Sequence, residues 1–208
     1  MRMFTNNFVN INYLFVKSIN IYLNSPGSPW FYIRKMLEYT EINFRKAGVI
    51  FMLSKRVEDS LTEQTYLVMH RHINGYGRLF GGQLLAWIDE LAGIVAKRHS
   101  ESEITTACID QLHFKHPVCL NDTLVMIGRI TYVGKTSMEV RIDSYVESLD
   151  GMRRLINRAY VVMVAIDIET GKSKQVPGLI LETEVQKAEW EGGKRRTDLR
   201  KHRKIEGY

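Results

Sequence analysis

The sequence predicts an α+β domain in which one long helix is wrapped by a strongly bent antiparallel sheet of about five strands. Three observations lead to this fold class. One segment is apolar at nearly every position over the length of a long helix, and five segments show the alternation or the β-branched residues typical of strands. The strands after the helix are separated by short turns, which join neighbouring strands as antiparallel hairpins.

The expected elements follow one another in a simple order. Residues 64–72 alternate between polar and apolar side chains, so they are expected to form the first strand. A turn at 74–78 comes next, and Gly81 and Gly82 begin a helix that runs to about Arg98. Four further strands are expected near residues 104–115, 122–133, 136–148 and 153–168.

The expected helix has almost no polar face. Its apolar residues are Leu84, Leu85, Ala86, Trp87, Ile88, Leu91, Ala92, Ile94, Val95 and Ala96. A helix of this kind is buried all round. Asp89 and Glu90 lie within it, and an ionised carboxylate is costly to bury unless it is paired or used. We therefore expect at least one of these carboxylates to have a specific partner or a function.

Residues 1–51 differ in composition from the rest of the chain, with seven of the ten asparagines and eleven of the 21 aromatic residues. Polar residues interrupt every apolar run well short of the ~20 residues that a membrane span needs. No small-residue cleavage site follows a compact apolar run, so a signal peptide is not indicated either. Our hypothesis is an upstream extension from a misplaced start codon, or a lineage-specific tail, with Met52 as the working start.

The charge of the protein is concentrated at its two ends. The formal net charge is +6, yet residues 1–51 and 187–208 each carry +4, which leaves −2 for residues 52–186. We expect 52–186 to be the folded domain and 187–208 to be a solvated basic tail, partly helical or disordered. Nucleic-acid binding could use only the basic ends, and a slightly acidic domain argues against it.

Cysteine and histidine residues give no sign of a redox or metal site. Two cysteines, Cys108 and Cys119, are too few for a secreted disulfide framework, so we expect reduced thiols in a cytoplasmic protein. The pairs His70/His72 and His113/His116 have no third ligand at a suitable spacing and are taken as ordinary strand histidines. No metal ion is therefore expected.

Two segments look superficially like phosphate-binding loops. The Gly75-to-Phe80 segment has a phenylalanine where a dinucleotide fingerprint needs its third glycine. The sequence Gly134-Lys135-Thr136 ends like a P-loop but lacks the first glycine at the required spacing. Neither a Rossmann site nor a P-loop is supported.

Four blocks of sequence, in order, resemble one known family. They are Asn74 to Ser100, with Leu-Phe-Gly-Gly at the start of the helix, then Asp110 to Val118, Gly134 to Val140, and Val176 to Gly178. This pattern resembles the hotdog-fold acyl-CoA thioesterases, specifically the bacterial acyl-CoA hydrolase group. The resemblance covers roughly residues 57–186 and implies the hotdog fold, a long central helix wrapped by an antiparallel sheet.

The resemblance also implies a catalytic arrangement. In this family an Asn from the loop and an Asp or Glu from the helix, on opposite subunits of a dimer, face each other across the thioester. The corresponding residues here are Asn74 and Asp89. Asp89 would act as general base on a water or, as the alternative, as a nucleophile. Backbone N–H groups at Gly81 and Gly82 would polarise the thioester carbonyl. The alternatives are an ordinary turn at Asn74 and a structural carboxylate at Asp89.

Coenzyme A, as part of the substrate, would need cations for its phosphates and a groove for its pantetheine. No separate cofactor is expected. The candidate substrate- and CoA-binding residues, each with an ordinary solvent-facing role as the alternative, are Phe80, Gly81, Arg98, His99, Ser100, Gly134, Lys135, Thr136, Ser137 and Arg158. Glu90 points about 100° away from Asp89 on the helix and is expected to face solvent or an interface.

The expected function is hydrolysis of acyl-CoA to a free acid and CoA, in a homodimer at minimum and, from the resemblance, a trimer of dimers. Asp89 lies seven residues beyond Gly82, about 10 Å along a helix, so one thioester could hardly reach both within one subunit. The main alternative is a non-catalytic acyl-CoA sensor on the same fold. A dehydratase would need a histidine where the loop offers Asn74.

Overall fold

The computed structural model describes Lys35 and residues 54–207. The chain divides into two units between Phe51 and Met52, and the second unit is described here. The hypothesis about the origin of residues 1–51 concerns a segment outside the described residues, except for Lys35.

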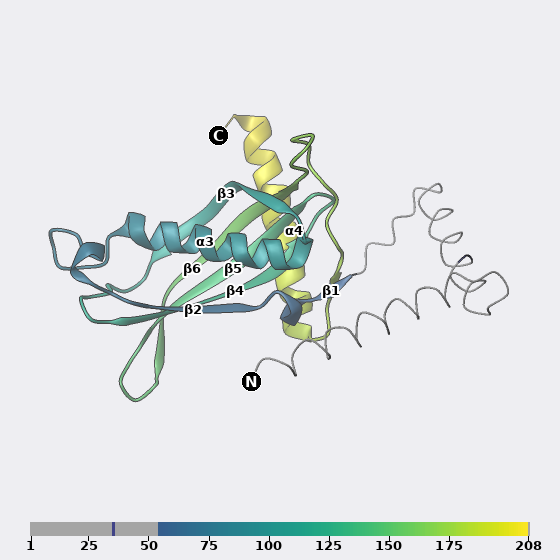
Figure 1. The fold of residues 1–208 in the computed structure, drawn as a ribbon. Coiled ribbons are helices and arrows are strands. Elements are labelled where there is room, and N and C mark those ends of the chain that lie inside the picture. The colour runs from purple at the N-terminus through teal and green to yellow at the C-terminus, as the bar shows by residue number, and fades with distance from the viewer. Residues whose placement is uncertain (1–34, 36–53, 208) are drawn as a thin grey trace, which may run out of the picture. The chain divides into compact units, whose positions relative to one another are not determined.

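A single antiparallel sheet forms the centre of the domain (Figure 1). Its strand order is β2-β4-β5-β6-β3, so β2 and β3 are the two edges. Each neighbouring pair is antiparallel. The expected hairpins are present between β4 and β5 and between β5 and β6, but the turn between β3 and β4 forms no hairpin, because β3 pairs with β6 at the edge of the sheet. The strands are β2 (Thr62–Leu67), β3 (Glu103–Phe114), β4 (Thr123–Val133), β5 (Ser137–Glu147) and β6 (Arg153–Ile166). Two short strands, β1 (Lys55–Arg56) and β7 (Leu179–Ile180), pair in parallel beside it.

The first strand is shorter than the sequence predicted. It ends at Leu67, and His70–His72 form a 3₁₀ turn, η2, in place of the end of a strand. The His72 ring stabilises this turn because its Nδ1 accepts a hydrogen bond from the Met69 N–H at 3.1 Å. The expectation that His70 and His72 are strand histidines was therefore wrong.

Helix α3 (Gly81–Ser100) packs one face against the sheet, and we call the side it covers the inner face. Leu84, Ile88 and Leu91 are fully buried on that side of the helix. The helix approaches the sheet closely at Gly128, where a Cβ atom would come within 2.8 Å of the side chains of Val95 and Ile142. A glycine is therefore required at this crossing.

The opposite side of α3 is open within one chain, so the expectation of a helix buried all round was wrong for the single subunit. Leu85 is exposed, Glu90 is exposed and Asp89 is half-buried. Phe80 and Phe114 are also exposed, at 57% and 54%, near the start of the helix. Apolar side chains in this position are typical of a surface that another protein chain covers.

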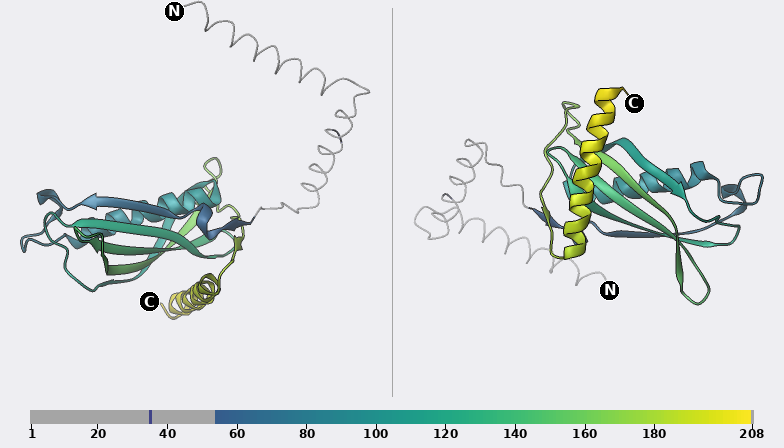
Figure 2. Two further views of the ribbon diagram at one scale, coloured as in Figure 1. Left: turned by 90° about the horizontal axis from the view of Figure 1, so that it is seen from below. Right: turned by 180° about the vertical axis from the view of Figure 1, so that it is seen from behind.

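The C-terminal segment forms helix α4 (Glu184–Glu206) instead of a solvated tail. Figure 2 shows α3 and α4 on opposite sides of the sheet, and we call the side under α4 the outer face. Thr183 caps the helix in a reciprocal pair with Gln186, so the expected boundary between residues 186 and 187 falls inside α4. Gly193 is buried against Tyr132, where a Cβ would lie 2.5 Å from the tyrosine Cβ.

The basic residues of α4 bind carboxylates on the outer face. Arg196 and Arg200 both pair with Glu139, and Arg200 and Arg203 both pair with Asp110. Burial alone would raise the pKa of Asp110, but hydrogen bonds from Arg203 and Arg200 outweigh it and hold that pKa below its ordinary value. These pairs fix the basic segment to the sheet, which composition alone did not reveal.

Removing the Glu139 carboxylate is expected to loosen α4. Glu139 is 1% exposed, so Glu139→Ala leaves Arg196 without its partner and should lower the free energy of unfolding by about 3 kcal/mol. Urea unfolding at a fixed protein concentration measures the change. The matched control, Glu184→Ala on the exposed first turn of α4, should cost about 0.5 kcal/mol or less. Equal losses for both variants would contradict the anchoring role of Glu139.

Candidate active site

The start of α3 presents backbone N–H groups that no side chain caps. Phe80 is the N-cap residue and its carbonyl accepts from the N–H groups of Gln83 and Leu84. Within the described part of the chain, neither the Gly81 nor the Gly82 N–H has a hydrogen-bond partner. These two donors, at the positive end of the helix dipole, can bind a carbonyl oxygen or an oxyanion.

Two aromatic rings lie over the glycines at this helix start. A Cβ at Gly81 would lie 3.3 Å from the Phe114 ring, and a Cβ at Gly82 would lie 2.5 Å from the Phe80 ring. A Cβ at Gly82 would displace the Phe80 ring, and one at Gly81 would fit tightly against Phe114. The rings give the helix start an apolar surround, which suits the acyl part of a thioester.

Asn74 lies in the loop between η2 (His70–His72) and α3 and organises a tight turn. Its Oδ1 accepts from the N–H groups of Tyr76 at 2.9 Å and Arg78 at 3.3 Å. This is the ordinary turn considered as the alternative, yet no described residue accepts a hydrogen bond from the Asn74 Nδ2. The side chain can hold the turn and still donate to a ligand.

A pocket of about 300 Å³ opens beside this turn, and we call it the Asn74 pocket. It lies between the start of α3 and the end of β3. Its lining residues are Asn74, Arg78, Leu79, Leu84, Phe114, Lys115, His116, Pro117, Val118 and Ile156. The structure therefore brings Asn74 together with the ring that covers Gly81.

Asp89 lies on the open side of α3, and Thr106 holds it. The Thr106 Oγ1 donates to Asp89 Oδ1 at 2.7 Å. Among the described residues no Lys, Arg or His forms an ion pair with Asp89. A carboxylate that a hydroxyl orients and no cation neutralises can accept a proton from water.

Thr106 was not among the residues expected from the sequence. The threonine pair 105–106 in β3 did place a hydroxyl on each face of the strand after the helix, which is a weak signal. Only the packing of α3 on β3 shows that one of them meets Asp89.

Asp89 does not line the Asn74 pocket of the same chain. It lies seven residues beyond Gly82, about 10 Å along the helix. Within one chain the structure thus places Asn74 in one pocket with Phe114, whose ring covers Gly81, and leaves Asp89 apart from it.

Three candidate residues at the far end of α3 are engaged in holding the fold. The Arg98 Nη1 donates to Thr62 Oγ1 at 2.8 Å. The His99 Nε2 donates to the Pro177 carbonyl at 3.1 Å, and Ser100 Oγ donates to a carbonyl of its own helix at 2.8 Å. His99 and Ser100 are buried, so neither is placed to contact a phosphate at the surface, which corrects the expectation for both.

The other candidates for CoA contacts lie away from the Asn74 pocket in this chain. The turn at Gly134, Lys135, Thr136 and Ser137 joins the last residue of β4 to β5. Leu67, from which the chain continues towards Asn74, pairs with the first residue of β4, at the opposite end of that strand. The length of β4, 11 residues, separates the two ends by roughly 33 Å. Arg158 lies on the outer face, where its Nε donates to Asp143 Oδ1 at 2.6 Å.

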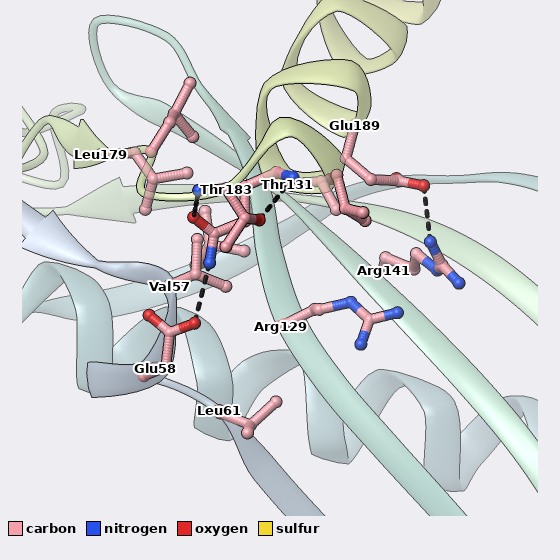
Figure 3. Close-up of a pocket in the computed structure, with 13 residues that line it drawn as sticks. Val57, Glu58, Leu61, Arg129, Thr131, Arg141, Leu179, Thr183 and Glu189 are labelled. Carbon is pink, nitrogen blue, oxygen red and sulfur yellow. Dashed lines mark hydrogen bonds and ion pairs between the residues drawn. The ribbon is translucent and has the colours of Figure 1, made fainter.

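A further pocket, of about 350 Å³, lies where α4 begins (Figure 3). Its polar side chains bind one another: Gln186 donates to Glu58 at 2.8 Å, and Arg141 pairs with Glu189. Leu61, Leu179 and several other apolar residues complete the lining. These contacts join η1 (Val57–Asp59), β5 and α4, so the pocket is a junction between elements and not a candidate site.

The described residues offer no alternative chemistry from metals or thiols. Nowhere in residues 54–207 do three or more His, Cys, Asp or Glu side chains gather as metal ligands would. Burial raises the pKa of the Cys108 thiol, which makes it a weaker nucleophile at neutral pH. None of the described helices is long and apolar enough to span a membrane.

Comparisons with known proteins identify the family of this chain. The family model described as "Thioesterase superfamily" matches residues 76–150. An uncharacterised acyl-CoA thioester hydrolase of Bacillus subtilis is 34% identical over 148 residues, which are 71% of this chain and 86% of that protein. The chain belongs to the thioesterase superfamily.

Solved structures of thioesterases share the fold. An apo-hexameric acyl-CoA thioesterase is 39% identical with a TM-score of 0.69, over 73% of this chain and 97% of its own. The Staphylococcus aureus acyl-CoA hydrolase, solved with butyryl coenzyme A, coenzyme A and coenzyme A disulfide, is 32% identical with a TM-score of 0.70, over 74% of this chain and 93% of its own. The hotdog fold expected from the sequence is confirmed.

The buried histidine of this thioesterase domain gives a prediction for its pH dependence. Burial lowers the pKa of His99 below 6.5, so the unfolded chain binds a proton first as the pH falls. Stability should be full above pH 6.5 and decrease as the pH falls towards the lowered pKa. Replacing His99→Phe should reduce this decrease.

Urea unfolding at about pH 7.5 and pH 5.5 measures the effect as a difference in the free energy of unfolding. His202→Gln, at an exposed position of α4, serves as the control and should leave the pH dependence as it is. An unchanged difference for His99→Phe would show that His99 does not set the acid sensitivity.

Proposed function

We propose that this protein hydrolyses acyl-CoA thioesters to a free carboxylic acid and CoA. The observation that carries the proposal is Asp89, a carboxylate without a cationic partner among the described residues, held by Thr106 on the open side of α3. Hydrolysis of this kind requires neither a metal ion nor a redox cofactor, and CoA is part of the substrate.

The spacing of substituted residues in a relative supports the same site. The Staphylococcus aureus enzyme has been solved as three single variants, each with alanine in place of one residue. The replaced residues are an asparagine, an aspartate fifteen residues after it, and a threonine seventeen residues after the aspartate. Asn74, Asp89 and Thr106 have the same residue types at the same two spacings. Thr106 joins the candidate site on this basis and on its hydrogen bond to Asp89.

In the proposed mechanism Asp89 acts as general base. It accepts a proton from a water molecule whose oxygen attacks the thioester carbonyl carbon. The oxyanion that forms accepts hydrogen bonds from the N–H groups of Gly81 and Gly82. Its collapse breaks the carbon–sulfur bond, and the leaving CoA thiolate takes the proton from Asp89, which restores the carboxylate. The Asn74 Nδ2 donates to the carbonyl or orients the water. Attack by Asp89 itself, through an anhydride, is the alternative.

The proposed site is shared between two subunits. Asp89 is about 10 Å from the start of its own helix, so the thioester at Gly81 and Gly82 needs Asp89 of the partner subunit. The exposed side chains of Phe80, Leu85 and Phe114 supply an apolar surface for such a dimer. A thioesterase that is 39% identical is hexameric, which supports a trimer of dimers here.

Replacing Asp89→Asn should lower kcat by about 100-fold or more, because the amide cannot accept the proton of water. Turnover of a panel of acyl-CoA substrates, followed by thiol release, measures this change. The matched control is Glu90→Gln on the same helix, which should retain near wild-type turnover. Binding of acyl-CoA by the wild type without any turnover would instead identify a non-catalytic sensor.

The two-subunit site can be tested by mixing inactive chains. Asn74→Ala and Asp89→Ala homodimers should each be inactive, whereas a mixed dimer has one site with both native residues. Random association of equal amounts, by co-expression or joint refolding, should restore about one quarter of wild-type activity in a two-fold symmetric dimer. No recovery in a mixture that light scattering shows to be oligomeric would contradict the shared site.

A further inference from the structure

The residue that follows Asn74 sets it apart from the other asparagines of the chain. Of the ten asparagines, only Asn74 has a glycine as the next residue. Asparagine is a thermolabile residue, because the next backbone nitrogen can attack its side-chain amide. A glycine after the asparagine favours this attack, since it has no Cβ to shield the nitrogen and its backbone turns freely. The local structure then decides whether the reacting groups are available.

The nucleophile and the leaving group of this attack are both free in the turn. Gly75 is exposed, and within the described part of the chain its N–H has no hydrogen-bond partner. The Asn74 Nδ2 likewise donates to no described residue. Neither group therefore has to break a hydrogen bond within the described chain before it reacts.

The carbonyl carbon of the Asn74 side chain is activated by the same turn. Its Oδ1 accepts from the backbone N–H groups of Tyr76 at 2.9 Å and Arg78 at 3.3 Å. Two donors on a carbonyl oxygen draw electron density from its carbon, and they stabilise the negative charge that an attacking nucleophile places on that oxygen. The donors that shape the turn thus also act as a small oxyanion site around the Asn74 amide.

We propose that Asn74 is a site of spontaneous deamidation, in which the Gly75 nitrogen attacks the Asn74 Cγ. The new N–Cγ bond closes a succinimide ring, and the Cγ–Nδ2 bond breaks. The Gly75 proton passes through solvent to the leaving nitrogen, which departs as ammonia. Water then opens the ring, at Cγ to give aspartate or at the main-chain carbonyl to give isoaspartate. The net reaction consumes one water molecule and releases one ammonia molecule.

The products lack the group that the proposed mechanism uses. A carboxylate at position 74 has no Nδ2 hydrogen to donate to the thioester carbonyl or to the water. It also places a negative charge beside the developing oxyanion, which is unfavourable. The loss of activity rests on the proposed function, whereas the modification itself does not. A preparation of the protein therefore loses active sites as it ages.

The test is a timed incubation of the full chain at neutral and at mildly alkaline pH, followed by peptide mapping with mass spectrometry. The peptide that contains Asn74 should gain the mass difference between a carboxyl and an amide group. The gain should be faster at alkaline pH, because base removes the Gly75 proton. Peptides that contain Asn121 and Asn157 should stay unchanged over the same period. Turnover of an acyl-CoA should fall in proportion to the converted fraction of Asn74.

Gly75→Ala is the variant that isolates the chemistry. A Cβ at Gly75 would meet nothing within 4 Å, and the residue does not have a left-handed backbone, so alanine is expected to keep the turn. Fresh Gly75→Ala should have wild-type turnover, and both its deamidation and its loss of activity should be several-fold slower. The matched control is Tyr76→Phe, at a residue that is 89% exposed. It keeps the backbone donor to Asn74 Oδ1 and should deamidate at the wild-type rate.

An Asn74 peptide that stays unmodified in the wild type at alkaline pH would overturn the inference. Equal rates in wild type and Gly75→Ala would do so too, because attack by the Gly75 nitrogen would then not be the route. Conversion without loss of turnover would overturn the inactivation, since the Asn74 amide would not be needed. If the fresh wild type hydrolyses no acyl-CoA, the proposed function fails, and the peptide map still decides whether Asn74 deamidates.

Discussion

The packing of α3 on the inner face of the sheet is the constraint on which the rest of the domain depends. Leu84, Ile88 and Leu91 are fully buried, and each such side chain contributes about 1.5–3 kcal/mol. Burying that face fixes the rotation of the helix, so Asp89, next to Ile88, must lie towards the open side. The same docking holds the first turn of α3 over the end of β3, where Phe114 covers Gly81. The buried core residues and the candidate catalytic residue Asp89 therefore lie on two faces of the same helix.

Electrostatics organise the outer face as apolar packing organises the inner one. Glu139 is almost wholly buried under α4, which is tolerable only because arginines of that helix reach it. A global net charge of +6 therefore says little about ligands, because much of the basicity of α4 is matched by acids of the sheet. Around one cavity of the outer face, cationic side chains outnumber carboxylates, although residues 52–186 as a whole carry a net charge of −2.

The strands and the helix were predictable from sequence because alternation, β-branched runs and short turns are local signals. Strands β4 and β6 begin within about a residue of the expected positions.

Errors arose where contacts between residues far apart in the sequence determine the structure. Alternation continues to His72, but a ring-to-backbone bond closes a turn there. The basic composition of 187–208 could not show that Arg203 meets Asp110, 93 residues away in sequence. His99 could not be recognised as buried, nor Thr106 as the partner of Asp89, without the packing of α3. The catalytic roles of Asn74, Asp89 and Gly82 stay predictions.

The position of α4 after all the strands has a consequence for how the domain is made. During synthesis the chain completes β3 and β5, with Asp110 and Glu139, before the arginines of α4 leave the ribosome. Until then these two acids have no guanidinium partners, and the outer face must remain hydrated. The inner face does not have to wait for its partner in this way, because α3 comes before the four longest strands in the chain. The order of the elements therefore lets the apolar packing of α3 on the sheet precede the ionic contacts of α4.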